Sequence, residues 1–172
     1  GLDVYVTQGD EYDIRVEADE NVIDLIGTDI RDGKLKIHAI ENIGRATKNV
    51  YVTLPEITAL SASSGSDLET RGTIASRNIR LDASSGADLK AAVEADEVEA
   101  DCSSGADIRV SGRTNLFYAD ASSGSDIKAG DLQAKICHAN ASSGADIRVY
   151  ATESLTADAS SGADIHYSGE AS

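Results

Sequence analysis

The chain has 172 residues, a length that suits one domain or one short repeat array. Its 15 Lys and Arg against 30 Asp and Glu give a net charge of −15 at pH 7. This charge argues against nucleic acid and anionic membrane surfaces as partners, because both need a basic face. Aromatic residues make up only 4% of the chain, so the core must consist mainly of smaller side chains. No apolar run approaches the roughly 20 residues of a membrane-spanning helix.

Residues 1–59 alternate between apolar and polar side chains over short stretches, which predicts β-strands. The predicted strands are residues 2–6, 12–16, 34–37 and 50–54. Turn signals at Gln8–Asp10 and Asp32–Lys34 are typical of hairpins. Residues 20–27 indicate a loop or a short helix, and residues 41–48 a polar loop. We expect this segment to form opening coils or a small antiparallel cap, since the terminal units of solenoids are atypical.

From residue 60 onward, one heptapeptide of the form Ala-Ser-Ser-Gly-Ala/Ser-Asp-Leu/Ile recurs six times, once with Cys in place of the first Ala. Its central glycines, which we expect in structural turns, are Gly65, Gly86, Gly105, Gly124, Gly144 and Gly162. These glycines are 21, 19, 19, 20 and 18 residues apart. A period near 20 residues indicates a solenoid in which each repeat is one coil.

The residues between the heptapeptides alternate like a strand and unlike a helix. From Ile79 to Ala95, apolar or small residues occupy every second position, as in a half-buried strand. A phase slip at Glu97 predicts a corner, and Gly112, Gly130 and Gly169 suit other corners. The same alternation predicts that the second serine of each heptapeptide points inward and satisfies its hydroxyl by hydrogen bonding. These serines are Ser64, Ser85, Ser104, Ser123, Ser143 and Ser161.

The predicted fold is all-β: a single-stranded β-solenoid, or parallel β-helix, with about 18–21 residues per coil. Right-handed coiling is expected, because right-handed crossovers dominate parallel sheets. Residues 1–59 form the atypical N-terminal β segment or cap, and residues 60–172 form the six-repeat array. We expect both parts to make one continuous domain.

Two outward columns of acidic side chains are the best functional lead. The column after the glycines contains Asp67, Asp88, Asp107, Asp126, Asp146 and Asp164. The column before the serine pairs contains Asp82, Asp101, Asp120, Asn140 and Asp158. Carboxylates stacked about 4.8 Å apart repel by roughly 1–3 kcal/mol per pair. One hypothesis is therefore that Ca²⁺, which binds six to eight oxygen ligands, bridges adjacent rungs.

The alternative hypothesis needs no cation. Aspartates two residues after a glycine can accept hydrogen bonds from the turn, and opposite charges on neighbouring strands stabilise a sheet. The next outward column is largely basic and contains Glu69, Lys90, Arg109, Lys128, Arg148 and His166. The column that begins at Asp82 is expected to lack a basic neighbour on its near side. It is interpreted either as a cation site or as a solvated acidic face.

No catalytic residue is assigned from the sequence. Cys102 and Cys137 fall on inward positions of different columns, too far apart for a disulfide, and are expected to be buried free thiols. His38, His138 and His166 are scattered and form no metal-binding motif, so the metal content stays unknown. The repeated Ser-Ser-Gly lacks the first glycine of a nucleophile elbow.

Several segments carry a family resemblance. They are GLDVYVTQGDEYDIRVEADENVIDLI, DGKLKI, NVYVTLPEITALSASSGSD and the repeated SSGxD turns. In these segments the chain is similar to the putative auto-transporter adhesin family with the head GIN domain, whose members are exported proteins common in Bacteroidetes. The resemblance implies export to the periplasm, outer membrane or cell surface of a Gram-negative bacterium. It implies adhesion, and it brings no catalytic residues and no cofactor.

The leading functional hypothesis is a non-enzymatic, adhesin-like module that binds or displays an unknown surface glycan or protein. The small number of aromatic side chains counts against a glycan, and Phe117 is expected inside. A second hypothesis is a structural module that self-associates through the ends or edges of the solenoid. A third, which rests on fold analogy alone, is a calcium-dependent carbohydrate-active enzyme on a β-helix.

Overall fold

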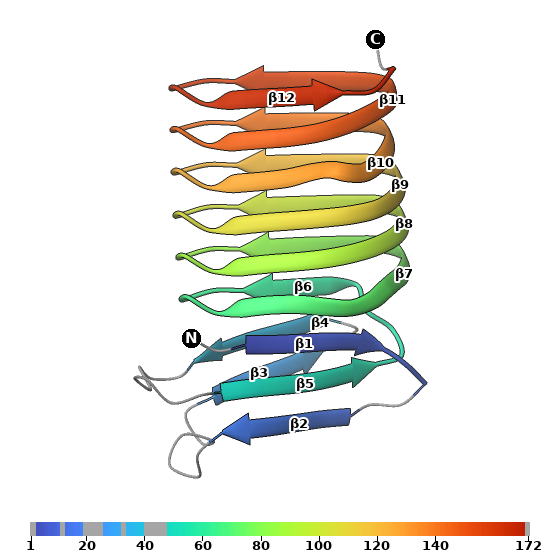
Figure 1. The fold of residues 1–172 in the computed structure, drawn as a ribbon, viewed down its shortest axis with the longest axis vertical. Helices are drawn as coiled ribbons and strands as arrows, with labels where there is room; N and C mark the ends of the chain where they lie inside the picture. Colours follow the sequence, from blue (N-terminus) through green and yellow to red (C-terminus); the bar gives the residue numbers. More distant parts are fainter. Residues whose placement is uncertain (1–2, 11–12, 19–25, 32–33, 40–47, 171–172) are drawn as a thin grey trace.

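The computed structural model describes residues 3–10, 13–18, 26–31, 34–39 and 48–170. In these parts of the chain every regular element is a β-strand (Figure 1). The strands are β1 (Asp3–Gln8), β2 (Asp13–Ala18), β3 (Ile26–Arg31), β4 (Lys34–Ala39), β5 (Lys48–Leu54), β6 (Ala59–Ala62), β7 (Asp67–Ala83), β8 (Asp88–Cys102), β9 (Asp107–Ala121), β10 (Asp126–Ala141), β11 (Asp146–Ala159) and β12 (Asp164–Ser168). No helix in the described residues is long and apolar enough to cross a membrane.

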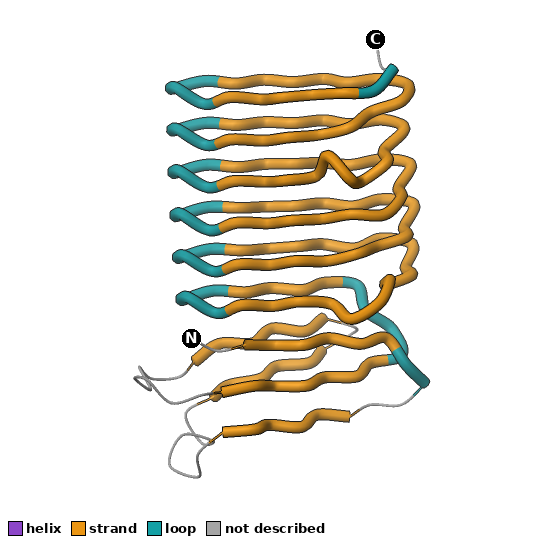
Figure 2. Tube along the Cα trace, viewed as in Figure 1, coloured by secondary structure: helices purple, strands orange, loops and turns teal. Residues whose placement is uncertain are grey.

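The strands β7 to β11 are the rungs of a β-solenoid, as the sequence predicts. Strands β7, β8, β9 and β10 each pair in parallel with the next strand along nearly their whole length. Each rung bends once, so that its first part lies in a front sheet and its second part in a back sheet (Figure 2). The front sheet also contains β2, β5, β1 and β12, and the back sheet also contains β3, β4 and β6.

The core lies between the two sheets and consists of stacked columns of identical or similar side chains. In the front sheet, one column joins the buried Leu68, Leu89, Ile108, Ile127 and Ile147. In the back sheet, small side chains line the edge next to the serine turns, and these residues are Ala62, Ala83, Cys102, Ala121 and Ala141. Phe117 is 1% exposed and is the largest fully buried side chain, as its inward position predicts.

The Ser-Ser-Gly segments form tight corners that lead from the back sheet to the front sheet of the next rung. In the first corner, Ser64 has φ of 56° and Gly65 has φ of 70°, and the Ser66 amide donates to the Ser63 carbonyl. Positive φ at both central residues with this bond is the pattern of a type I′ turn. All six corners share it, with φ of 53° to 56° at the second serine.

The expectation that the second serine points inward is wrong. Ser64, Ser85, Ser104, Ser123, Ser143 and Ser161 are exposed at the tips of the turns. The strand alternation stops at each turn, because a left-handed backbone rotates the side chain out of the pleat. The buried hydroxyls belong to Ser66 and Ser125 instead, two residues later. The Ser66 hydroxyl donates to the Ser63 carbonyl at 2.7 Å, and the Ser125 hydroxyl bonds equivalently to Ser122.

The N-terminal part departs from the parallel stack. Strands β1 and β5 continue the front sheet in parallel below β7, whereas β2 pairs with β5 antiparallel. Strands β3 and β4 form an antiparallel pair, and β4 continues the back sheet through β6. The hairpin expected at Gln8–Asp10 is wrong, because β1 and β2 lie on opposite sides of β5. The sequence also missed β3, which takes residues 26–27 of the loop or short helix expected at 20–27. Residue 48 of the loop expected at 41–48 belongs to β5, and residues 20–25 and 41–47 lie outside the described residues.

The second edge of each rung is a wider corner, and the pairing of β7 with β8, β9 with β10 and β10 with β11 contains register shifts. The predicted corner at Glu97 is confirmed, since the alternation changes phase there and Val98 is buried behind it. Gly112 has φ of 118°, and a Cβ at this position would lie 1.8 Å from the Val93 carbonyl oxygen. Only glycine permits this close approach of neighbouring rungs. The two cysteines are buried and free, as predicted.

Candidate functional site

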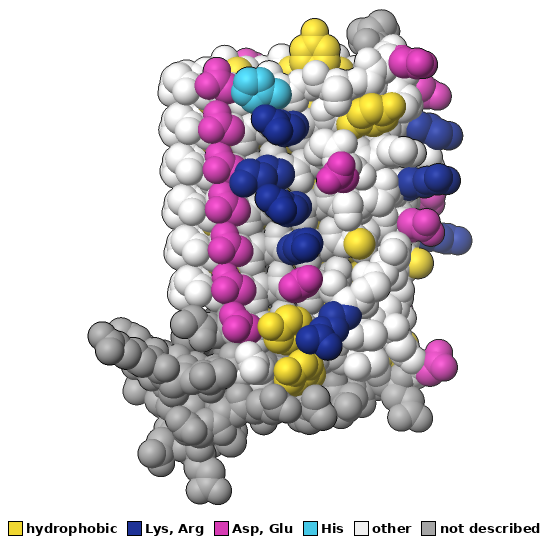
Figure 3. All heavy atoms as spheres, viewed as in Figure 1, with side chains coloured by type: hydrophobic (Ala, Val, Ile, Leu, Met, Phe, Trp, Pro, Cys, Tyr) yellow, Lys and Arg dark blue, Asp and Glu magenta, His cyan; other side chains and the backbone are white. Residues whose placement is uncertain are grey.

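The longest outward feature of the front sheet is a column of seven carboxylates, the magenta stack in Figure 3. The strand register places Asp3 beside Asp67 and continues through the Asp that follows each turn. Its members are Asp3, Asp67, Asp88, Asp107, Asp126, Asp146 and Asp164. The sequence predicts six of them. Asp3 lies in no heptapeptide, and it joins the column only because β1 pairs with β7.

Burial and the neighbouring carboxylates raise the pKa of two members of this column, Asp67 and Asp107. Burial raises the pKa of Asp67, and the carboxylates of Asp88 and Asp3 raise it further. Burial also raises the pKa of Asp107, with additional contributions from Asp126 and Asp88, and Lys128 acts in the opposite direction. Stacked like charges therefore destabilise the ionised form, as expected for carboxylates on successive rungs.

A basic column runs parallel to the carboxylates, two residues further along each strand. It contains Lys90, Arg109, Lys128, Arg148 and His166, with Glu69 before them. Within the described part of the chain, no salt bridge under 4.0 Å joins this column to the carboxylate column. Lys90 pairs with Glu69 at 3.9 Å instead. A shallow groove of about 520 Å³ separates the two columns near Asp88 and continues toward Asp146.

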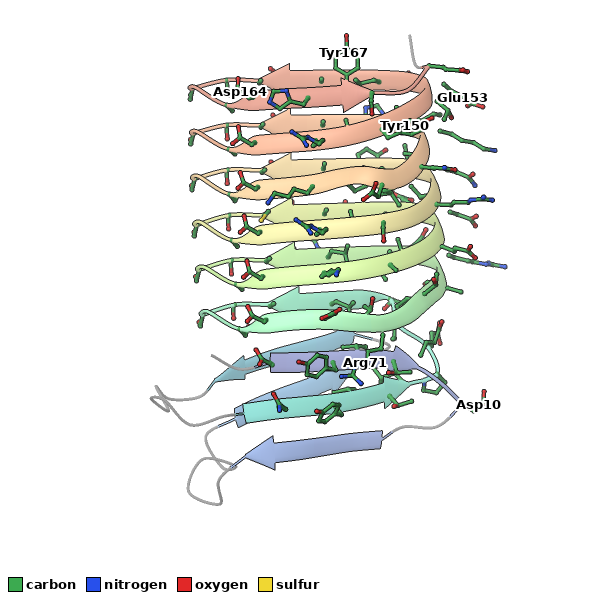
Figure 4. The ribbon with its side chains drawn as sticks, in the orientation of Figure 1. Asp10, Arg71, Tyr150, Glu153, Asp164 and Tyr167 are labelled. Carbon is green, nitrogen blue, oxygen red and sulfur yellow. The ribbon has the colours of Figure 1, made fainter. Side chains whose placement is uncertain are left out.

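An aromatic cluster lies at the N-terminal end of the same face. Tyr5 and Tyr51 come from the neighbouring strands β1 and β5 and stack with ring centroids 5.3 Å apart. The guanidinium of Arg71 lies 4.4 Å from the centroid of Tyr5 (Figure 4). This cation–π contact joins the first rung to the strands below it.

The second acidic column lies on the back sheet, and the register confirms its alignment. Its members are Asp82, Asp101, Asp120, Asn140 and Asp158. The expectation that it lacks a basic neighbour is wrong at its first rungs. Arg80 bonds Asp82 at 3.1 Å and Asp101 at 2.7 Å, and its guanidinium lies 3.7 Å from Glu99. Burial raises the pKa of Asp101 although Arg80 opposes this shift.

An aromatic pair beside this column was not predicted. Tyr118 and His138 occupy the same position on β9 and β10 and stack with centroids 5.1 Å apart and planes 13° from parallel. A groove of about 410 Å³ lies between this pair and the side chains of Asp120, Asn140 and Asp158. The only sequence signal for this pair was its spacing: Tyr118 and His138 lie at the same distance before the heptapeptides that follow them.

The remaining candidate residues form no further cluster in the described structure. No group of three or more His, Cys, Asp or Glu is arranged there to hold a metal ion. His138 and His166 lie on different sheets, and the side chain of His38 is outside the described residues. The turn glycines Gly65, Gly86, Gly105, Gly124, Gly144 and Gly162 have φ between 70° and 77°.

Three solved structures show the same fold. A putative adhesin from Bacteroides fragilis is 17% identical with a TM-score of 0.81, and the match covers 99% of this chain and 87% of that one. A putative adhesin from Parabacteroides distasonis is 19% identical with a TM-score of 0.78, with 99% and 83% covered. A putative lipid binding protein from the same species is 19% identical with a TM-score of 0.66, with 99% and 87% covered.

No curated protein matches the chain. The family model described as "Putative auto-transporter adhesin, head GIN domain" matches residues 1–171. This match spans the N-terminal strands as well as all six serine turns. The chain therefore belongs to the putative auto-transporter adhesin, head GIN domain family.

Proposed function

We propose that this protein is an exported, non-enzymatic, adhesin-like module that binds a glycan or a protein at the cell surface or in the periplasm. The observation that carries this proposal is the repetition of outward chemistry along two broad sheet faces. On each face, columns of like side chains border shallow grooves that continue over several rungs. Such extended surfaces are how solenoid proteins contact large partners. Family membership supports the same function.

The same repetition argues against catalysis. General acid–base chemistry needs two titratable groups whose surroundings push their pKa values apart. In the front column, Asp67 and Asp107 each lie between two other aspartates, and their pKa values shift in the same direction. Serines at the turn tips are likewise repeated in identical positions, whereas a nucleophile needs a special environment.

The chemistry of the partner follows from the charges. A net charge of −15 repels polyanions, so nucleic acid is a poor candidate. The front face offers carboxylates beside Lys and Arg, and the back face offers carboxylates, an amide and an aromatic pair. Both sets suit hydrogen-bonding partners such as glycans or polar protein surfaces.

The proposal is tested with the purified chain against immobilised glycans and extracellular proteins, read by saturable binding and by release of product. We expect saturable binding to at least one surface and unchanged glycans after prolonged incubation. Cell fractionation of the source bacterium should place the protein in the periplasm, outer membrane or surface fraction. Release of shortened glycan, or a purely cytosolic location, would overturn the proposal.

A further inference from the structure

We propose that the groove beside Tyr118 and His138 on the back sheet is a carbohydrate-binding subsite for neutral or amino sugars. This inference rests on the proposed binding function and assigns it a place and a ligand class. It is distinct from the long columns of the front face, which lie on the other side of the molecule.

The groove is where the solenoid departs from its own repetition. The position of Tyr118 and His138 is filled by Arg80 and Glu99 on the rungs before them and by Thr156 on the rung after. In the neighbouring column, Asn140 is the single amide among four aspartates. Selective recognition needs a local set of groups, and here the one aromatic pair of the described back sheet lies beside the one amide of the aspartate column.

The walls and floor of the groove have complementary chemistry. One wall is the stacked pair of Tyr118, which is 38% exposed, and His138. The other wall consists of Asp120, Asn140 and Asp158, two residues further along each strand, which is about 7 Å in an extended chain. The floor is formed at Ala100, Ala119 and Ala139, which are 2% to 4% exposed. The side chains of these alanines face the core, so the floor itself is strand backbone with a wall of outward side chains on either side.

The available hydrogen-bonding groups select the ligand. Arg80 engages Asp82, Glu99 and Asp101, so the cation next to the groove is already paired. No hydrogen bond or ion pair is found among the described residues for the side chains of Asp120, Asn140 and Asp158. They therefore offer free acceptors, and Asn140 also offers a donor.

Sugar hydroxyls and ammonium groups match these acceptors, and the C–H groups of a sugar ring can pack against the part of Tyr118 that its stack with His138 leaves exposed. Carboxylated or sulfated sugars do not match, because the carboxylates of this wall repel them. A groove of about 410 Å³ is within the size range of small-molecule sites, so it suits a few sugar units and not a whole polymer.

The test uses three oligosaccharides of equal length: cellohexaose, which is neutral, a glucosamine hexamer, which is cationic, and a galacturonate hexamer, which is anionic. Binding is measured by isothermal titration calorimetry at 0.15 and 0.5 M NaCl, so that nonspecific attraction of the cation to an acidic protein is screened. We expect binding of the first two at both salt concentrations and none of the third.

Variants locate the binding. Tyr118→Ala and Asn140→Ala should each weaken binding of both ligands at least tenfold. Asp120→Asn keeps the shape and should weaken only the glucosamine hexamer, leaving cellohexaose within twofold. Tyr150→Ala, on the opposite sheet (Figure 4), is the matched control and should change neither affinity. Thermal melts of each variant establish that the fold is retained.

Two results would overturn the subsite while leaving the proposed function standing. One is sugar binding that Tyr118→Ala and Asn140→Ala leave intact, which would put the site on another face. The other is a chain that binds a protein surface but neither neutral nor amino sugar. Preferential binding of the galacturonate hexamer would also refute the charge argument.

Discussion

Asp107 is the position where the electrostatics of the front column can be tested most directly. Its carboxylate lies between those of Asp88 and Asp126 on the adjacent rungs. Burial and these two neighbours raise its pKa. The substitution Asp107→Asn removes one charge from the centre of the column and keeps the size and shape of the side chain.

The expected effect is a gain in stability at neutral pH. Two unit charges about 4.8 Å apart repel by about 1 kcal/mol in a water-like medium. Asp107 is half-buried and has two such neighbours, and Lys128 offsets part of the repulsion. We therefore expect Asp107→Asn to raise the free energy of unfolding by about 1–2 kcal/mol at pH 7. For a chain of this length that corresponds to a rise in Tm of about 2–4 °C per kcal/mol.

The pH dependence has a definite sign. Because the folded-state pKa of Asp107 is raised above its ordinary value of 3.8, the folded protein holds this proton to higher pH than the unfolded chain. The stabilisation that the bound proton gives to the folded state is fully present below pH 3.8. It is lost as the pH rises through the folded-state pKa of Asp107. Wild type should therefore approach the variant in stability as the solution is acidified toward pH 4.

Urea unfolding at pH 7 and pH 4 measures both effects. Asp131→Asn is the matched control, because Asp131 lies on the same face outside the column. Its unfolding free energy should change by less than about 0.5 kcal/mol. If Asp107→Asn destabilises the protein at pH 7, the carboxylate makes a stabilising contact that exceeds the repulsion, and the reasoning fails.

Three other outcomes are expected. Gly112→Ala should lower the free energy of unfolding by about 3 kcal/mol or more, because the new Cβ would meet the Val93 carbonyl oxygen and the φ of this residue is positive. The control Gly130→Ala should lower it by less than about 1 kcal/mol. Equal urea midpoints for the two variants would contradict this. Burial raises the pKa of Cys102 to about 11 and of Cys137 to about 12. Neither thiol should therefore react with a disulfide reagent at pH 8 until urea unfolds the chain. Rapid labelling of the folded protein would refute this. EDTA should leave Tm unchanged, because no group of three metal-ligating side chains is arranged in the described structure. A rise of Tm in millimolar calcium would contradict this and would support the calcium hypothesis.

The rungs could be predicted because two independent patterns coincide in them. The heptapeptide fixes the length of a coil, and the alternation around Leu81 and Leu89 fixes which side faces the core. The orientation of Ser85 could not be predicted in this way, because a positive φ leaves no trace in a polar–apolar pattern. Strand β3 was missed because Gly27, Thr28 and Asp29 give it no clear apolar side.

The two acidic columns were predictable because their members have a fixed offset from the heptapeptide. The six aspartates after the turns align because each has the same offset from a glycine. Asp3 lies in no repeat and aligns through the pairing of β1 with β7 alone. Tyr118 and His138 share an offset from their heptapeptides, but the stacking of their rings cannot be read from that offset. The ion pairs of Arg80 also cross from one rung to the next, so counting neighbours along one strand missed its contact with Asp101.

The left-handed serines have a consequence for how the molecule can change in length. Each costs on the order of 1 kcal/mol or more in backbone strain. Besides the bond that closes each turn, the turns also bond to the neighbouring coil, as when the Gly65 amide donates to the Ser85 carbonyl. Stability therefore resides in the nearest-neighbour interfaces. Gene duplication or loss that adds or removes whole coils preserves the interfaces between neighbouring coils. An insertion or deletion of only a few residues within a coil disrupts the interfaces on both sides of that coil. Evolution can thus set the reach of this protein in steps of one coil.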